Sequence, residues 1–66
     1  MHLVKLSDVK KGDWVRLVRN GQPTSKTYQR EYYERSEKKY CLTDIDNINS
    51  WVFRKGETLV FLDCSF

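Results

Sequence analysis

The sequence contains few cysteines, prolines, glycines and histidines: two, one, three and one among 66 residues. Two cysteines, Cys41 and Cys64, are too few for the disulfide framework of a small secreted scaffold. No apolar run is long enough for a signal peptide or a membrane-spanning helix. We therefore expect a cytoplasmic protein without a membrane segment, in which both cysteines are buried thiols; a disulfide is the alternative if the chain is exported.

The scarcity of histidine also argues against catalysis and metal binding. The only histidine, His2, lies at the chain terminus, and no serine or cysteine is placed to complete a nucleophilic arrangement with it. His2, Cys41 and Cys64 lack the paired spacing of a zinc site, and the stretch 44–49 lacks the glycine and distal glutamate of a calcium loop. We expect no enzymatic activity, no metal and no cofactor, so the protein is expected to act by binding.

Aromatic residues are plentiful instead, at 14% of the chain. Each ring can bury about 150–250 Å², which lets a short chain assemble a core without a disulfide or a metal. This content excludes an intrinsically disordered chain, since disordered segments are poor in aromatic and β-branched residues. Residues 1–66 are therefore expected to form a single domain.

Short apolar runs separated by turn signals predict β-strands along the chain. Residues 13–19 are the clearest strand, and Asn20-Gly21 directly after them predicts a tight turn. The stretch 44–50 is rich in Asp and Asn and is expected to form turns. Residues 51–54 and 58–62 predict two further strands, the second of them buried on both faces or closing a barrel.

Ahead of the first strand, the chain is expected to pack Leu6 and Val9 beneath the sheet; a short helical turn capped by Ser7 is the alternative. Phe66 is expected to fold back at the other end. About five short strands with regular turn signals predict an all-β domain, a small SH3-like or OB-like barrel. We prefer the SH3-like form because the strands are short and the first loop contains Asn-Gly-Gln-Pro.

Residues 26–45 allow two structures. A helix would gain favourable charge pairs four residues apart, such as Glu31 with Arg35. The tyrosines of this stretch spread over more than one helical stripe, however, and its Tyr, Thr and Cys content favours strands. We therefore expect a β-hairpin that turns near Ser36-Glu37.

The register of this hairpin is open. A two-residue loop pairs Tyr33 with Tyr40 and Tyr32 with Cys41, whereas a three-residue loop pairs Tyr32 with Leu42 and Tyr33 with Cys41. A slip of one residue exchanges the faces of a strand, so the register also decides which side chains lie together.

Positive charge is concentrated in the first half of the chain, although the net charge is only +3. Residues 1–30 hold seven basic and two acidic residues, whereas residues 31–66 hold five basic and seven acidic ones. A basic half attracts phosphate, and a solvated surface of mixed charge is the alternative.

Cations alternate with aromatic rings at the start of the predicted hairpin. On an extended strand, Lys26, Tyr28, Arg30 and Tyr32 share one face, on which rings could stack on bases and cations could meet phosphates. The hypothesis is a module that binds single-stranded nucleic acid, with stacking by Tyr28 and Tyr32 and with Trp14 in reserve. Phosphate contacts are expected from Lys10, Lys11, Arg16, Arg19, Lys26 and Arg30. The alternative is that both tyrosines lie in the core beneath the stems of the two cations.

The second hypothesis is a protein-interaction module. Small barrels with aromatic grooves bind extended or proline-rich peptides, and here Trp14, Tyr33, Tyr40 and Trp51 could line such a groove. A strand edge could also pair with a partner protein or with a second copy of the chain, so a homo-oligomer is possible.

Four segments of the chain carry a resemblance. They are Gly12-Asp13-Trp14-Val15, Tyr33-Glu34-Arg35-Ser36-Glu37-Lys38-Lys39-Tyr40, Asp44-x-Asp46-x-Ile48-Asn49 and Lys55-Gly56-x-x-x-Val60. Together they resemble a family of short uncharacterised proteins of gut bacteria and of their phages and mobile elements, over residues from about Leu6 to Phe66. The resemblance carries no assigned activity. It implies a phage or mobile-element context, where small barrels that bind nucleic acid or host proteins are common.

Overall fold

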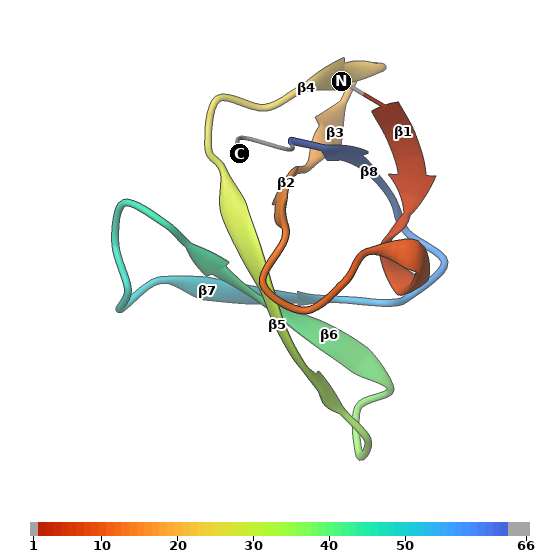
Figure 1. Ribbon diagram of the computed structural model, residues 1–66, viewed down its shortest axis with the longest axis vertical. Helices are drawn as coiled ribbons and strands as arrows, with labels where there is room; N and C mark the ends of the chain where they lie inside the picture. Colours follow the sequence, from red (N-terminus) through yellow and green to blue (C-terminus); the bar gives the residue numbers. More distant parts are fainter. Residues whose placement is uncertain (1, 64–66) are drawn as a thin grey trace.

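The chain folds into one six-stranded antiparallel sheet and a separate two-stranded one (Figure 1). The computed structural model describes residues 2–63. In spatial order the large sheet consists of β1 (His2–Lys5), β8 (Leu59–Leu62), β2 (Trp14–Arg16), β5 (Tyr28–Glu34), β6 (Lys39–Asp44) and β7 (Trp51–Arg54). The all-β prediction is confirmed. Within residues 2–63 no pairing joins β7 to β1, so the sheet is open, and the predicted barrel of about five strands is not shown.

The large sheet curls so that its concave side encloses the core. In Figure 1 the β5–β6–β7 meander crosses below β1, β8 and β2, which brings the two halves of the concave side together. The buried side chains come from four strands and from the segment after β1: Leu6, Val9, Val15, Tyr28, Leu42 and Val60. Burial of each aliphatic side chain stabilises the fold by about 1.5–3 kcal/mol, so these few residues account for much of the packing energy.

The segment after β1 forms the 3-10 helix η1 (Leu6–Asp8). Leu6 and Val9 are buried, as the sequence predicts. The helical turn forms without a side-chain cap, so Ser7 does not have the capping role that the alternative gave it. The Ser7 N–H instead donates to the carbonyl of Gly56 at 2.9 Å, which fixes η1 against the loop before β8.

The strand predicted over residues 13–19 is divided at Leu17, so its predicted continuity is wrong. Residues beyond the break form β3 (Val18–Arg19), which pairs only with β4 (Gln22–Pro23) in the small sheet. The carbonyl of Leu17 accepts a hydrogen bond from the Thr24 N–H at 2.9 Å, which closes this small hairpin. Asn20 and Gly21 have φ values of 53° and 76°, the left-handed backbone that a two-residue hairpin loop needs, and the predicted turn is confirmed.

The hairpin predicted over residues 26–45 is confirmed as β5 and β6. Next to its turn Tyr33 pairs with Tyr40, as the two-residue loop predicts, and the three-residue alternative is wrong. Farther from the turn the register shifts by one, and Arg30 pairs with Leu42. Residues 31 and 32 therefore stand together opposite a single residue of β6. This is a β-bulge, which reverses the alternation of side chains along β5.

β1 is not among the strands predicted from the sequence. In the structure β1 is an edge strand that pairs with β8, with Val4 opposite Val60. β8 is not buried on both faces, which corrects that prediction: Val60 is fully buried, whereas Leu59 is 48% exposed. The expectations for Cys64 and Phe66 lie outside the described residues.

Candidate functional site

The bulge decides which side chains of β5 lie together. Tyr28 and Arg30 precede it on the concave side, where Tyr28 is part of the core and 7% exposed. Tyr32 faces the convex side, where its ring meets that of Phe53 edge-on with the centroids 6.4 Å apart. The prediction that Lys26, Tyr28, Arg30 and Tyr32 share one face is therefore wrong, because the extra residue reverses the alternation. Tyr28 is not available to stack on a base.

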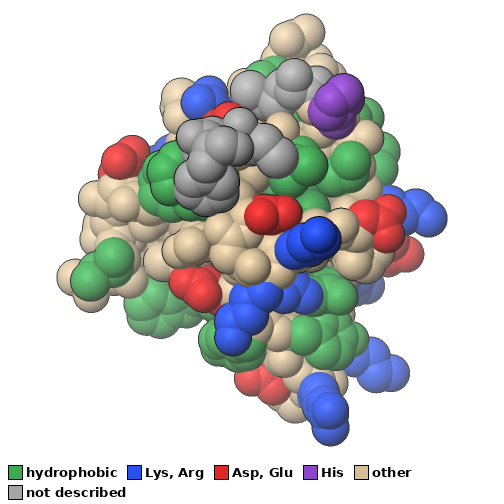
Figure 2. Space-filling view, viewed as in Figure 1, with side chains coloured by type: hydrophobic (Ala, Val, Ile, Leu, Met, Phe, Trp, Pro, Cys, Tyr) green, Lys and Arg blue, Asp and Glu red, His purple; other side chains and the backbone are tan. Residues whose placement is uncertain are grey.

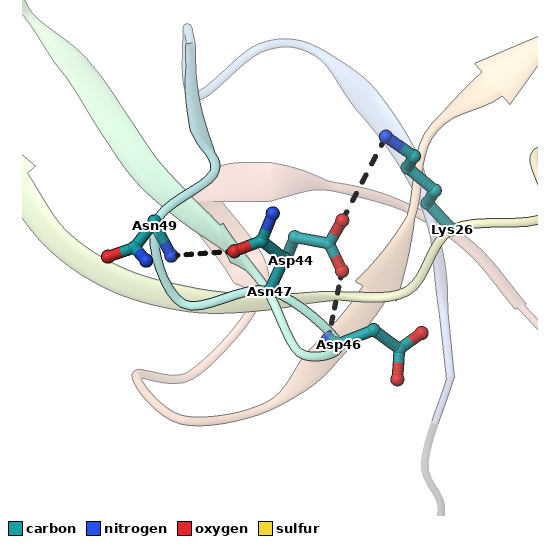
Figure 3. A network of polar contacts seen from close by, with 5 residues as sticks. All are labelled: Lys26, Asp44, Asp46, Asn47 and Asn49. Carbon is teal, nitrogen blue, oxygen red and sulfur yellow. Dashed lines mark hydrogen bonds and ion pairs between the residues drawn. The ribbon is translucent and has the colours of Figure 1, made fainter.

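Lys26, which precedes β5, lies against the loop between β6 and β7 (Figure 3). Its Nζ is 3.9 Å from Oδ2 of Asp44, a carboxylate whose side chain is only 7% exposed. Oδ1 of Asp44 accepts a hydrogen bond from the Asp46 N–H at 2.9 Å, and Oδ1 of Asn47 accepts one from the Asn49 N–H at 3.1 Å. These side-chain bonds build the predicted turns. Lys26 therefore compensates a buried carboxylate instead of joining a strip of phosphate contacts.

Two more of the predicted phosphate contacts lie apart from the hairpin. Arg16 on β2 donates from Nε to Oδ2 of Asp63 at 3.0 Å, in a half-buried ion pair. Arg19 is exposed on β3, in the small sheet. Arg16 is already paired with a carboxylate and therefore gains less from a phosphate. Arg19 belongs to the separate two-stranded sheet. Neither residue therefore extends a continuous basic surface from β5.

The turn before β2 places two exposed lysines next to β5. The Asp13 N–H donates to the Lys10 carbonyl at 3.1 Å and closes the turn. Gly12 has a φ of 95°, which suits the third position of a type II turn. The Gly12 N–H also donates to the carbonyl of Arg30 at 2.8 Å, so the turn that carries Lys10 and Lys11 lies beside Arg30.

A basic and aromatic surface forms on the concave side of the hairpin, where β5 and β6 project beyond the body of the molecule (Figure 1). The rings of Tyr33 and Tyr40 lie 4.8 Å apart, and the guanidinium carbon of Arg30 lies 4.2 Å from the centroid of Tyr40. Arg54 of β7 is the cross-strand partner of Tyr40 and so lies on the same face. We call Arg30, Tyr33, Tyr40 and Arg54 the hairpin surface.

The hairpin surface combines exposed and restrained groups. Tyr33 is 43% exposed, and Arg30 is half-buried. The Nε of Arg30 is buried and has no hydrogen-bond partner among the described residues. Figure 2 shows Lys and Arg side chains next to hydrophobic ones over the hairpin and over the turn before β2. Since packing on Tyr40 already holds the guanidinium, a ligand that it binds loses less affinity to side-chain ordering.

The convex side of the sheet carries a different set of rings. Cross-strand pairing aligns Trp14, Gln29, Thr43 and Trp51 in one row across four strands. Phe53, beside Tyr32, lies on the same side as Trp51, because residues two apart on a strand share a face. We call Tyr32, Trp51 and Phe53 the outer aromatic face; Tyr32 is 49% exposed and Trp51 55%.

The four residues expected to line one protein-binding groove are therefore divided between two faces. Tyr33 and Tyr40 lie on the concave side of the hairpin, whereas Trp14 and Trp51 belong to the convex row. The concave and convex sides are opposite faces of the same sheet, so the four rings do not form one groove. Arg54 and Phe53 are not among the site residues predicted from the sequence, although alternation along a strand over residues 51–54 places them on opposite faces.

Cys41 lies on the convex side, between Tyr32 and Phe53. Cys41 is 5% exposed and is a free thiol, so the prediction of a buried thiol is confirmed here. Burial raises the pKa of Cys41, a hydrogen bond with Thr43 lowers it, and the Glu31 carboxylate raises it further. Partial desolvation of its phenol against the sheet raises the pKa of Tyr32, together with the charges of Cys41 and Glu34. Glu31 and Glu34 thus lie near this face, where Lys39 is the cross-strand partner of Glu34.

The chain matches no protein-family model, no curated protein and no solved structure. No helix within residues 2–63 is long and apolar enough to cross a bilayer. The same residues contain no group of three His, Cys, Asp or Glu side chains placed to hold a metal ion.

Proposed function

We propose that the protein is a non-catalytic module that binds single-stranded nucleic acid through the hairpin surface. The observation that carries this proposal is the cluster of Arg30, Tyr40 and Tyr33, in which the cation lies over one ring and the second ring is tilted against the first, at the projecting end of the hairpin. Aromatic rings stack on unpaired bases, and each stacked base contributes about 1–3 kcal/mol. Cations beside the rings hold the phosphate backbone.

The distribution of charge supports this choice of ligand. Arg54 lies beside Tyr40 on the hairpin surface, and the turn with Lys10 and Lys11 lies beside Arg30. A single strand can stack a base on the exposed ring of Tyr33 while its phosphates follow these cations. A duplex keeps its bases stacked inside and leaves the rings without partners, so single strands fit the surface better.

We also propose that the curled sheet is a variant of the SH3-like barrel, with an OB-like barrel as the alternative. Three features support it: β5, β6 and β7 form a meander, β8 returns beside β2, and the β3–β4 hairpin occupies the connection from β2 to β5. We propose a cytoplasmic protein of a phage or mobile element, a context in which single-stranded nucleic acid is present as a ligand. Fold and context alone do not establish a ligand, so the proposal depends on the hairpin surface.

Two adjacent tyrosines on opposite faces provide the test. Binding of a fluorescently labelled oligonucleotide of about 12 nucleotides is followed by anisotropy at low salt, since one binding fold covers about 4–16 nucleotides. We expect Tyr33→Ala to weaken binding by about tenfold or more, because it removes a stacking ring. Tyr32→Ala removes the same side chain from the other face and is expected to leave binding nearly unchanged.

A second pair of variants tests the cations. Arg30→Met keeps most of the side-chain stem and removes the charge, and Arg19→Met makes the same change on the small sheet. We expect Arg30→Met to weaken binding more, and to reduce the slope of log affinity against log salt by about 0.7, the value for one lost phosphate contact. Equal effects of Tyr32→Ala and Tyr33→Ala, or no binding at low salt, would remove this proposal.

A further inference from the structure

The guanidinium of Arg30 is half-buried, and its N–H groups have no acceptor among the described residues. Its Nε is buried without a hydrogen-bond partner, and no carboxylate within residues 2–63 forms an ion pair with it. Nη1 and Nη2 are not buried in the same way. Charges that leave water are normally paired, and these two terminal nitrogens form a planar fork of N–H donors. The fork is therefore the part of Arg30 that is open to a ligand.

Both the backbone and the side chain of Arg30 are held in place. Its N–H donates to the Asp13 carbonyl at 2.9 Å, and its carbonyl accepts the Gly12 N–H at 2.8 Å, which fixes the residue to the turn before β2. Its guanidinium carbon lies 4.2 Å from the centroid of the Tyr40 ring. That ring in turn lies close to Gly56, where a Cβ atom would be 3.1 Å from Cε2 of Tyr40. These contacts limit the directions in which the fork can point.

A base stacked on the exposed ring of Tyr33 lies within reach of this fork. The ring centroids of Tyr33 and Tyr40 are 4.8 Å apart, with the ring planes tilted by 58°. The guanidinium carbon is therefore no farther from the Tyr33 centroid than the sum of this distance and the 4.2 Å that separates it from Tyr40. This limit is similar to the long dimension of a purine, so one base can contact both the ring and the fork.

Guanine offers the acceptors that suit a pair of N–H donors. Its O6 and N7 are neighbouring acceptors, whereas adenine has a donor beside N7 and thymine has a methyl group beside its acceptor. Cytosine has two acceptors, O2 and N3, on its pairing edge, but a single ring stacked on Tyr33 extends less far toward Arg30 than a purine does. A base that leaves the half-buried fork without acceptors binds less tightly, because the desolvation of the N–H groups is not compensated.

We propose that the hairpin surface prefers guanine among the bases of a single strand, with Tyr33 stacking on the base and Arg30 donating to its O6 and N7. This inference rests on the proposed binding of single-stranded nucleic acid and assigns a base to that site. Where the strand has no guanine, Arg30 contacts the phosphate backbone, which is the contact that the salt dependence measures. The exposed cations Lys10, Lys11 and Arg54 meet phosphates in both cases.

The probes are labelled oligonucleotides of about 12 thymines in which one central base is replaced by guanine, adenine or cytosine. Binding is followed by anisotropy at one low salt concentration. We expect the guanine oligonucleotide to bind at least about fivefold more tightly than the other two and than thymine alone, the lower limit for one bidentate contact.

Two modified bases test which atoms are contacted. With 7-deazaguanine at the centre, which has a C–H group in place of N7, we expect most of the preference to be lost. Hypoxanthine lacks the amino group of guanine but keeps O6 and N7, so we expect it to retain the preference. The two changes leave a stacked purine in place, so a difference between them comes from the edge of the base.

Variants of Arg30 separate the fork from the charge. Arg30→Lys keeps the charge and removes the fork, so we expect the affinities for the guanine and adenine oligonucleotides to become equal, while the salt dependence with thymine alone is retained. Arg30→Met is expected to lose both the preference and about 0.7 of the slope of log affinity against log salt. Arg19→Lys makes the matched change on the small sheet and is expected to leave the preference unchanged. Variants that remain folded are recognised by their NMR dispersion.

Three outcomes would overturn this inference and leave nucleic-acid binding in place. Equal affinity for the four bases would mean that Arg30 contacts only phosphate. Equal binding of guanine and 7-deazaguanine would exclude a contact with N7, and a preference that persists in Arg30→Lys would exclude the fork. Absence of binding to every oligonucleotide at low salt would instead remove the proposed function and this inference together.

Discussion

Arg30 lies over the ring of Tyr40, with the guanidinium carbon 4.2 Å from the ring centroid. The two residues stand on neighbouring strands, and Tyr40 is two residues from Leu42, the residue opposite Arg30. Such diagonal neighbours lie within reach of long side chains. The contact links the lysine turn before β2 to the projecting end of the hairpin.

The contact predicts a measurable coupling between the two side chains. In a double-mutant cycle with Arg30→Met and Tyr40→Leu, we expect a coupling of about 0.5–1 kcal/mol in the free energy of unfolding, measured by urea denaturation. The two substitutions keep an apolar side chain at each position and remove the charge and the ring. The same cycle with Arg19→Met in place of Arg30→Met is the control, and additive effects in both cycles would contradict a cation–ring contact.

Gly56 provides a prediction about the attachment of η1. A Cβ atom at this position would lie 3.1 Å from Cβ of Ser7 and 3.1 Å from the ring of Tyr40. We expect Gly56→Ala to lower the free energy of unfolding by about 1–3 kcal/mol, because the ring and η1 must move apart. Urea denaturation of Gly56→Ala alone and with Ser7→Gly gives the test. Ser7→Gly removes one of the two contacts, so we expect the double variant to recover part of the lost free energy of unfolding. An unchanged unfolding midpoint in Gly56→Ala would argue against this close approach.

The ion pair between Lys26 and Asp44 predicts an asymmetry between its partners. Asp44 is 5% exposed and accepts the Asp46 N–H, so we expect Asp44→Ala to cost about 1–3 kcal/mol of stability. Asp44→Asn retains an acceptor for that N–H and is expected to cost less. The side chain of Lys26 is 63% exposed, so Lys26→Met should cost at most about 1 kcal/mol. A larger loss for Lys26→Met than for Asp44→Ala, by thermal or urea unfolding, would contradict this account.

The raised pKa of Cys41 predicts how stability depends on pH. The Cys64→Ser variant, in which Cys41 is the only cysteine, isolates this group. Below the ordinary thiol pKa of about 8.5, both folded and unfolded chains keep the proton, and stability does not change through this group. Above it the unfolded thiol ionises first, because burial raises the pKa of the folded one, so stability falls as pH rises.

Urea denaturation between about pH 7 and 9.5 measures this effect, since the upper limit stays below the ordinary pKa of tyrosine. The double variant Cys64→Ser, Cys41→Ala is the control and is expected to show a smaller fall in stability over the same range. An identical pH dependence in the two proteins would mean that the Cys41 thiol ionises equally in the folded and unfolded chains.

The local sequence determines the turns of this protein and the type of its elements. Asn20-Gly21 favours a tight hairpin because both residues tolerate left-handed backbone. The side chains of Asp44 and Asn47 accept hydrogen bonds from N–H groups two residues later, and these bonds do not depend on tertiary contacts. The hairpin over 26–45 also follows from composition. These features depend on interactions between residues close in sequence.

Only the tertiary structure decides which side chains meet. The bulge at residues 31–32 exists because β5 pairs with β6 in two registers, and no property of these residues alone gives its position. It sends Tyr28 to the core and Tyr32 to the opposite face, while Tyr33 meets Tyr40 beside Arg30. The residue types that could bind nucleic acid are thus visible in the sequence. Their grouping is not, because one unpaired residue exchanges the faces of a strand.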